Sequence, residues 1–272
     1  MQHPSRRHDV FAKICRNVGR TACKYGMIAP GDRILLGLSG GKDSLVLMHA
    51  LTRIQARAPF EFSVTAVNVD MGFAEFDGPG LDRYCAAQGW NFERVQFPAG
   101  MKLVKEKMGK KSPCALCSRL RRGQLHGAAD RLGCNVIALG QHLDDLCVSL
   151  LMSLFRGNGL KTMGPHVAAD GGRKRLIRPL CETAEQMMIE AAAEFNFPKF
   201  GCCDYSDRME KSGDRAFLER LLDQLAARFP NIRHTMLESM GSVRLNHLLD
   251  LRHLTLPPAL TPDAAEEEDE AD

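Results

Sequence analysis

The sequence predicts an α/β protein with a doubly wound, mainly parallel sheet of about five strands, followed by a small C-terminal helical appendage. An apolar run at 33–38 leads through a tight Gly-rich turn into a helical pattern that continues to about residue 57. A second run, rich in β-branched residues, follows at 62–70. Strand, turn, helix and strand in this order form a βαβ unit, which makes the two strands parallel and puts helices on both faces of the sheet.

The other elements follow from hydrophobic periodicity and from Pro and Gly breakers. Residues 6–27 place basic side chains around an apolar stripe, which predicts an amphipathic helix with a basic face. The Gly-containing stretch at 157–165 predicts a long flexible loop, a candidate substrate lid or RNA contact. We expect further strands at 92–97, 135–140 and 173–180, and further helices at 81–89, 141–155, 183–196, 213–229 and 231–240.

The chain divides into four segments by composition. We expect a basic N-terminal helix at 1–30, a nucleotide-binding domain at 31–200 with a cysteine-containing insertion, a C-terminal segment with helices at 201–255, and a disordered acidic tail at 256–272. No apolar run has the length of a membrane span and the N-terminus lacks an apolar signal core, so we expect a cytoplasmic protein. Ten cysteines in such a chain indicate reduced thiols, some of them metal or cluster ligands.

The net charge of +3 conceals a basic body. Seven acids lie within 263–272, so the rest of the chain carries +10. A charge of this size suits a polyanionic partner such as RNA, with an ordinary solvated surface as the alternative. Eight basic residues lie within 102–122, against a single acid, Glu106. The side chains that we expect to contact RNA are Lys110, Lys111, Arg119, Arg121, Arg122 and Lys161.

The turn after the first strand, Ser-Gly-Gly-Lys-Asp-Ser at 39–44, has the features of a phosphate-binding loop. Its glycines allow successive N–H groups to point at one place, at a helix N-terminus where anions are favoured, and Lys42 adds a counter-charge. It is not a Walker A loop, because that pattern needs glycine at Leu36 and Ser or Thr at Asp43. The loop resembles the pyrophosphatase-type loop of the PP-loop (N-type) ATP pyrophosphatase superfamily, and this resemblance implies catalytic roles for Lys42, Asp43 and Asp145. The expected ATP-binding residues are Leu38, Ser39, Gly40, Gly41, Lys42, Asp43, Ser44, Asp70 and Gly140.

Acidic residues follow two of the predicted strands. Ligands of parallel sheets bind at the carboxyl ends of the strands, so Asp70 is expected near the nucleotide, on ribose or Mg²⁺, with a turn cap as the alternative. Asp144 and Asp145 open the helix after the strand at 135–140 and serve at least as caps. Mg²⁺ prefers a few carboxylates together with phosphate oxygens, which makes Asp43 and Asp144 its candidate ligands.

The basic stretch contains a Cys-x-x-Cys pattern at Cys114 and Cys117. Two thiolates at this spacing can bind one metal ion or cluster, and the Lys and Arg neighbours favour the thiolate form. Buried inert cysteines and a redox dithiol are the alternatives. The cysteines that we expect to be packing residues are Cys15, Cys23, Cys85, Cys134, Cys147 and Cys181.

The ordered set of these motifs resembles the tRNA 2-thiocytidine synthetase (TtcA) group of the PP-loop (N-type) ATP pyrophosphatase superfamily, from about residue 16 to 250. The matching landmarks are Gly31–Ser44, Val67–Asp70, Cys114–Gly123, Ala138–Asp145, Ile177–Leu180 and Phe197–Cys202. The resemblance implies an adenine nucleotide alpha hydrolase-like (HUP-type) fold. It also implies an enzyme that uses ATP and Mg²⁺ to adenylate the 2-oxo group of cytidine 32 in the tRNA anticodon loop. Sulfur then replaces that group, giving 2-thiocytidine, AMP and pyrophosphate.

The resemblance further implies a [4Fe-4S] cluster held by Cys114, Cys117 and Cys202. The family commonly has Pro-Cys-x-x-Cys at the third position, whereas this chain has Gly-Cys-Cys-Asp at 201–204. Cys203 is therefore an alternative ligand, and a different substrate is an alternative function. Two neighbouring residues rarely both reach one metal without strain, and we favour Cys202 because of its position within the resemblance. The expected partners are tRNA, a cysteine desulfurase or another sulfur donor, and a second copy of the chain in a homodimer, with no membrane.

Two other functions fit parts of the sequence. A PP-loop ligase of the tRNA-lysidine type would adenylate its substrate without a cluster, and its cysteines would be incidental or bind structural zinc. A non-enzymatic RNA-binding protein with zinc or an Fe–S cluster would leave the loop at 39–44 unexplained. Iron, sulfide and zinc content, together with pyrophosphate release from ATP, distinguishes these functions.

Overall fold

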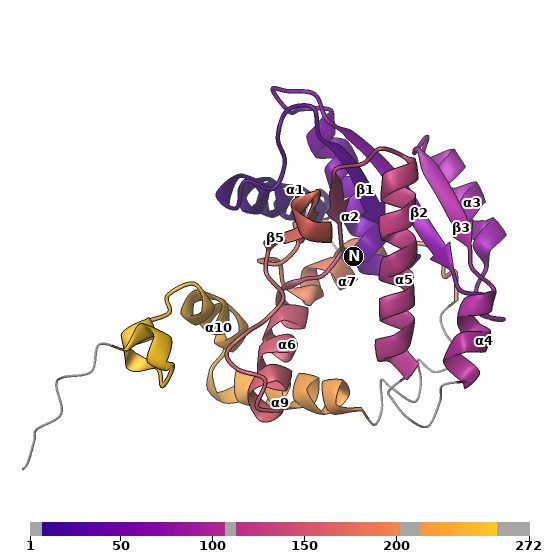
Figure 1. The fold of residues 1–272 in the computed structure, drawn as a ribbon. Coiled ribbons are helices and arrows are strands. Elements are labelled where there is room, and N and C mark those ends of the chain that lie inside the picture. The colour runs from indigo at the N-terminus through magenta and orange to yellow at the C-terminus, as the bar shows by residue number, and fades with distance from the viewer. Residues whose placement is uncertain (1–6, 107–112, 202–212, 255–272) are drawn as a thin grey trace, which may run out of the picture. The chain divides into compact units, whose positions relative to one another are not determined.

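The structure, a computed structural model, describes residues 7–106, 113–201 and 213–254. It contains one sheet with helices on both faces (Figure 1). The strands are β1 (Arg33–Gly37), β2 (Ser63–Asp70), β3 (Phe92–Gln96), β4 (Val136–Ala138), β5 (His166–Ala169) and β6 (Lys174–Ile177). Their order is β3-β2-β1-β4-β6-β5, and all are parallel except β5, which pairs antiparallel with β6 at one edge. The predicted α/β class and mainly parallel sheet are confirmed.

The helices occur where hydrophobic periodicity predicts them, with two additions. They are α1 (Arg7–Lys24), α2 (Lys42–Gln55), α3 (Gly78–Ala87), α4 (Ala99–Glu106), α5 (Pro113–Arg131), α6 (Leu143–Phe155), α7 (Glu185–Phe195), α9 (Asp214–Arg228) and α10 (Ile232–Met240). The additions are α4 and α5, so the Cys-x-x-Cys pattern opens a long helix. Three short 3₁₀ helices are η2 (Asp170–Gly172), η3 (Leu245–His247) and η4 (Leu251–His253).

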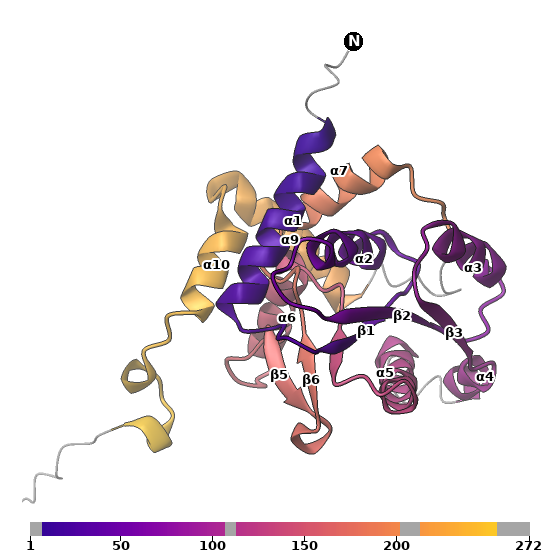
Figure 2. The same ribbon diagram turned by 90° about the horizontal axis from the view of Figure 1, so that it is seen from above.

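The helices form two layers around the sheet (Figure 2). On one face α1, α2 and α7 pack against one another, and α2 also contacts β1 and β2. On the other face α5 lies against β1, β2 and β4, with α4 beside it. Because both faces are covered, the β1 residues Ile34, Leu35 and Leu36 are all fully buried, as parallel strands require.

The strand order places a crevice beside β1. The chain leaves β1 towards β2 on one side and returns through β4 on the other, so the connections diverge above the carboxyl ends of β1 and β4. Such a switch point is where open α/β sheets bind their ligands. The loop at 39–44 lies directly after β1 and therefore borders this crevice.

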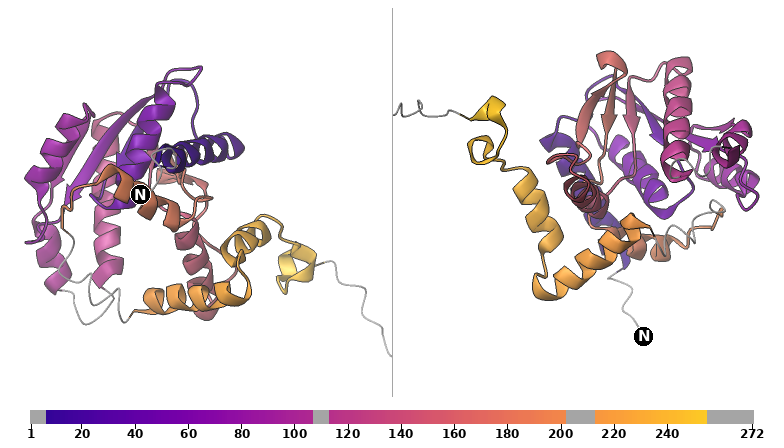
Figure 3. Two further views of the ribbon diagram at one scale, coloured as in Figure 1. Left: turned by 180° about the vertical axis from the view of Figure 1, so that it is seen from behind. Right: turned by 60° about the horizontal axis from the view of Figure 1, so that its bottom comes forward.

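The described C-terminal part is helical, as predicted. Helix α9 packs on α6 (Figure 3). Leu218 and Leu222 of α9 lie with Leu143 and Cys147 of α6 in one apolar cluster. The chain separates into two compact units, and the break falls after Leu237. The second unit contains the end of α10 and the helices η3 and η4, and the expected tail at 256–272 lies outside the described residues. None of the described helices combines the length and hydropathy that a membrane span needs.

The cysteines expected to be packing residues divide into two groups. The prediction is confirmed for Cys85, Cys134, Cys147 and Cys181, which are buried. It is wrong for Cys23, which is exposed near the end of the amphipathic helix α1, and Cys15 on the same helix is half-buried. Position on a helix face, which cysteine composition does not reveal, decides the difference.

An aromatic cluster around His49 joins the helices of the α2 layer. The imidazole stacks on Phe195 at 4.9 Å between ring centroids and on Phe197 at 5.4 Å, and it forms a T-shaped pair with Trp90 at 4.7 Å. His49 Nε2 lies 2.9 Å from the hydroxyl of Tyr84. Burial in this cluster lowers the pKa of His49 to about 4.

Acidification should therefore destabilise the wild-type fold more than a His49→Phe variant. Because the folded-state pKa of His49 is depressed from 6.5 to about 4, the unfolded chain binds the proton preferentially between these values and stability falls as pH falls. Between pH 7 and pH 5 the loss from this residue should be about 1 to 2 kcal/mol. Urea unfolding of both proteins at the two pH values measures it, and equal losses in the two proteins would contradict the assignment.

Candidate functional site

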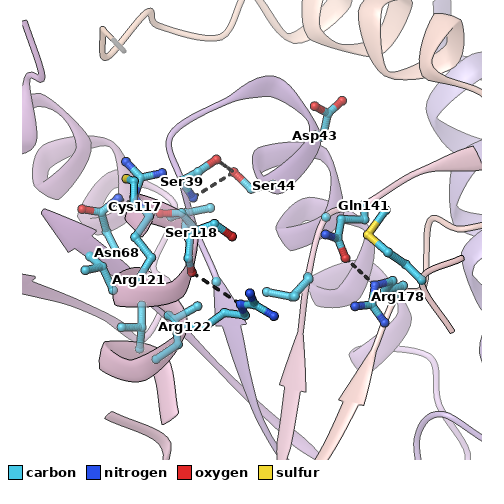
Figure 4. Close-up of a pocket in the computed structure, with 18 of the residues that line it drawn as sticks. Ser39, Asp43, Ser44, Asn68, Cys117, Ser118, Arg121, Arg122, Gln141 and Arg178 are labelled. Atoms are coloured by element: carbon cyan, nitrogen blue, oxygen red, sulfur yellow. Dashed lines mark hydrogen bonds between the residues drawn. The ribbon is translucent and has the colours of Figure 1, made fainter. Parts of the chain in front are cut away.

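A cavity of about 610 Å³ opens at the carboxyl ends of β1, β2 and β4 (Figure 4). The phosphate loop and β2 form one part of its wall, and α5 forms another. The segments that follow β4 and β6 complete it. Its polar lining includes Ser39, Asp43, Ser44, Asn68, Cys117 and Arg178.

The phosphate loop is held in shape by its own serines. Ser44 Oγ donates to the Gly41 carbonyl at 2.9 Å and accepts from the Ser39 N–H at 3.2 Å, while Ser39 Oγ accepts from the Gly41 N–H at 3.2 Å. Gly40 has φ +85°, a conformation that side-chain-bearing residues rarely adopt. In the part of the chain that the structure describes, no side chain caps the N-terminus of α2. The first-turn N–H groups therefore remain available to an anion, as the loop motif predicts.

Two glycines permit close contacts around the loop. A Cβ on Gly140 would lie 3.1 Å from Ser44 N and 3.2 Å from Asp43 C, so the end of β4 touches the first turn of α2. A Cβ on Gly201 would lie 1.7 Å from the Glu75 carbonyl oxygen, and Gly201 has φ +74°. The chain just before Gly201 is fixed as well, because the Phe200 carbonyl accepts a 2.8 Å hydrogen bond from Asp77 N.

Lys42, Asp43, His142 and Glu185 form a charged cluster at the start of α2. Lys42 Nζ lies 2.7 Å from Glu185 Oε1 and 3.3 Å from Asp43 Oδ2. Burial alone lowers the pKa of Lys42, but attraction to Asp43 and the hydrogen bond to Glu185 outweigh it, so the pKa is raised and the amine stays charged. Burial raises the pKa of Asp43, against the pull of Lys42 and His142.

The same cluster has the donor set of a cation site. Ligand atoms of Asp43, His142 and Glu185 all lie within 4.8 Å of one another. The buried Oδ1 of Asp43 has no hydrogen-bond partner among the described residues. Such an oxygen can act as a ligand for a cation. Sequence analysis did not single out Glu185 or His142, because Glu185 comes from α7, 143 residues after Lys42.

Asp144 and Asp145 have other partners. Asp145 caps α6 by accepting from His142 N at 3.1 Å and pairs with Arg215 on α9. Asp144 accepts from Glu185 N at 2.7 Å and pairs with Arg233 at 2.5 Å. Burial would raise the pKa of Asp144, but these donors and His142 outweigh it and lower the pKa. Asp144 therefore joins the starts of α6 and α7, and it lies outside the cation-ligand group of Asp43.

Near the end of β2, Asn68 is the polar side chain that lines the cavity. It comes before Asp70 on the same face of the strand. Asp70 accepts from Arg94 at 2.9 Å and from Gly72 N at 3.0 Å, which is the turn-cap arrangement weighed from sequence. The buried Asn68 donates from Nδ2 to the Leu38 carbonyl at 2.7 Å and ties the phosphate loop to β2. A single amide inside a β-branched strand was the available signal for this residue.

Helix α5 brings the Cys-x-x-Cys pattern to the cavity. Cys117, Arg121 and Arg122 line it (Figure 4). Cys114 lies in the first turn of α5, where the structure describes the backbone alone. Arg119 and Lys161 are exposed. Four residues of the expected sites, Lys110, Lys111, Cys202 and Cys203, lie outside the described residues.

A family model described as a PP-loop domain matches residues 12–200. The chain belongs to the PP-loop family. The resemblance to its TtcA group is confirmed by curated relatives named tRNA-cytidine(32) 2-sulfurtransferase. The relative from Sorangium cellulosum is 41% identical over 88% of this chain and 83% of its own length. The relative from Geobacter sulfurreducens is 36% identical over 89% and 93%.

A solved PP-loop-like structure shares the fold. The U34-tRNA thiolase NcsA from Methanococcus maripaludis, solved with its [4Fe-4S] cluster, superposes with a TM-score of 0.70. The superposition covers 88% of this chain and 81% of the thiolase, and the two sequences are 20% identical. A likeness at this identity supports the architecture of the PP-loop fold in this chain.

The PP-loop should lose nucleotide affinity when Gly140 is replaced by alanine. The new Cβ would press on Ser44 N and the Asp43 carbonyl carbon, and so displace backbone N–H groups aimed at the phosphates. We expect ATP affinity to fall by about tenfold or more, since preorganised donors lose most of their effect when displaced. Titration calorimetry measures it.

The matched control is Gly123→Ala on α5, where the added Cβ has no atom within 4 Å apart from the nearby backbone of its own helix. That variant should bind ATP like the wild type and be slightly more stable, because alanine favours a helix. Equal ATP affinity in the Gly140→Ala and Gly123→Ala variants would show that the close contact has no part in nucleotide binding.

Proposed function

We propose that this protein is an ATP-dependent tRNA sulfurtransferase that replaces the 2-oxo oxygen of cytidine 32 with sulfur, in the cytoplasm. The observation that carries this proposal is the single cavity lined by both the PP-loop and Cys117. Adenylation and sulfur transfer must act on the same carbonyl group, and residues suited to each step face one space. The shared name of the curated relatives supports tRNA as the substrate.

The PP-loop would hold the phosphates of ATP. Its uncapped helix N-terminus, the positive-φ Gly40 and the charged Lys42 form a cradle for an anion. We assign the expected ATP contacts to Leu38, Ser39, Gly40, Gly41, Ser44 and Gly140. Asp70 stays a proposed ribose contact only if the Arg94 pair opens, because Arg94 and Gly72 occupy its carboxylate.

The charged cluster would hold Mg²⁺ beside the phosphates. Asp43 is the expected ligand that the structure supports, through its unpartnered Oδ1, and Glu185 is the second carboxylate within reach. Asp144 and Asp145 would act one step away, because they hold the start of α7 and the N-terminus of α6 in place. A bound Mg²⁺ would offset the charge of pyrophosphate as it leaves.

A [4Fe-4S] cluster would be held by Cys114, Cys117 and Cys202. The fit rests on Cys117, whose position on the cavity wall matches a ligand that faces the substrate. Three thiolates would leave one iron free to bind an external sulfide. Gly201, which lies against Glu75, is the last described residue before Cys202, and Cys202 itself lies outside the described residues.

The reaction divides into two steps, adenylation of the 2-oxo oxygen and replacement of the adenylated oxygen by sulfur. The 2-oxo oxygen attacks the α-phosphorus of ATP, an O–P bond forms, and the bond to pyrophosphate breaks. Hydrosulfide then bonds to C2 and loses its proton, and the C2–O bond breaks with AMP as the leaving group. Lys42 would stabilise charge on the departing pyrophosphate. A cysteine desulfurase or another donor would supply the sulfur, and a homodimer is part of this proposal by resemblance alone.

Lys42→Ala should abolish adenylation and leave iron binding intact. The variant removes the cation that faces the leaving group, and Lys42 has no contact with α5 among the contacts described. We expect tRNA-dependent pyrophosphate release to fall by about a hundredfold or more. Lys13→Ala, an exposed lysine on α1, is the matched control. Release above a tenth of the wild-type rate in Lys42→Ala would contradict the role.

Cys117→Ser should lose the cluster and keep the fold. Anaerobically purified wild type should contain about four irons and four sulfides per chain, and the variant should contain neither. Cys23→Ser is the matched control, since Cys23 is exposed on α1. Cys202→Ala and Cys203→Ala, prepared separately, should differ, and the variant that loses iron identifies the third ligand. Zinc alone, or no metal, in the wild type would favour the lysidine-type ligase.

A further inference from the structure

Three arginines face the cavity that the PP-loop and Cys117 share. Arg121 and Arg122 enter from α5, and Arg178 enters from the segment after β6 (Figure 4). Arg121 lies four residues after Cys117, so both side chains lie on the same face of the helix. Arg178 is buried, and sequence analysis assigned it no role.

The contacts of these arginines are neutral. Arg178 donates from Nε to Gln141 Oε1 and from Nη1 to the Gly164 carbonyl. Arg121 lies over the ring of Phe73, 5.6 Å from its centroid. Arg122 donates to the Ser118 carbonyl at 3.5 Å. Within residues 7–106, 113–201 and 213–254, none of the three arginines forms an ion pair.

Elsewhere several buried or half-buried basic side chains pair with carboxylates. Arg94 pairs with Asp70 and Asp82, Arg175 pairs with Asp32, and Lys174 pairs with Asp130. The carboxylate in the cavity lining, Asp43, is already paired with Lys42. The cavity is therefore a place where positive charge is gathered and left uncompensated.

Placing several guanidinium charges together in a partly buried cavity costs free energy when no anion is bound. Burial, together with repulsion from Arg122, lowers the pKa of Arg178, although Cys181 and Asp145 act in the opposite sense. A bound anion would relieve both effects, and a guanidinium can hold two oxygens of a phosphate at once. The phosphates of ATP already have a cradle at the PP-loop, where Lys42 supplies the cation.

We infer that Arg121, Arg122 and Arg178 bind a phosphodiester group of the substrate RNA, next to the nucleotide whose base enters the cavity. This assignment rests on the proposed function. Arg121, Cys117 and the PP-loop line one cavity. A phosphate held by Arg121 would therefore place the base of the adjoining nucleotide in the space between Cys117 and the PP-loop. Phosphate contacts fix register without reading sequence, and they offset the cost of unstacking a base.

Salt dependence of tRNA binding tests the assignment. Each lost phosphate contact to single-stranded RNA should reduce the slope of log K against log salt by about 0.7. We expect this reduction in Arg121→Gln and in Arg122→Gln, with ATP affinity unchanged within about twofold. The matched control is Arg131→Gln at the other end of α5, where the arginine pairs with Glu93. Its slope should equal that of the wild type.

A second measurement locates the phosphate. An anticodon stem-loop RNA with one neutral methylphosphonate beside cytidine 32 lacks the charge that the arginines bind. If the assignment holds, Arg121→Gln weakens binding of the unmodified RNA but causes no further loss with the methylphosphonate RNA. Arg178→Lys, which keeps the charge but not the planar fork, should give an intermediate loss on the unmodified RNA. Additive losses from the arginine substitution and the methylphosphonate would overturn the assignment.

The remaining outcomes separate the two proposals. A fall in ATP affinity with an unchanged salt slope would overturn the inference and place the arginines on the nucleotide. Unchanged slopes and unchanged ATP affinity would overturn it as well. Wild-type protein that binds tRNA weakly and without salt dependence would overturn the proposed function itself, and the inference with it.

Discussion

The contact between the end of β4 and the first turn of α2 is the constraint on which the site depends. Gly140 has no side chain, so its backbone lies against Ser44 and Asp43 and fixes the start of α2 relative to the sheet. Asn68 fixes the other side of the same loop through the Leu38 carbonyl. The loop is thereby held between β2 and β4, on both sides of its phosphate-binding turn.

Local sequence was enough to predict the architecture around that contact. A buried strand, a Gly-Gly turn and a helix leave a signature within twelve residues, and the acids that follow strands fall at the carboxyl edge by the geometry of parallel sheets. Three elements, α4, α5 and β5, were not predicted, and the sequence shows a physical reason for two of them. Helix α5 contains arginines, cysteines and glycines that break the apolar stripe, and β5 has only four residues and pairs as an antiparallel edge.

Long-range partners were beyond sequence reasoning. Glu185 reaches Lys42 from a helix 143 residues away, and no spacing rule connects them. Arg178 directly follows the short strand β6, and a basic residue at the end of a strand is usually exposed to solvent. It is buried here because β6 pairs with β4 inside the sheet. Asp144 illustrates the reverse case, because its motif suggests a metal ligand while its oxygens bind Glu185 N and Arg233.

The shared cavity has a consequence for the fate of an activated base. Adenylated cytidine is reactive towards water, and an enzyme with separate sites would have to carry it across solvent. In a space of about 610 Å³ bounded by the PP-loop, α5 and the segment after β6, the activated carbon would stay where it was formed. Hydrolysis that merely regenerates cytidine and wastes ATP would then compete only during the time that sulfur transfer at the same site takes.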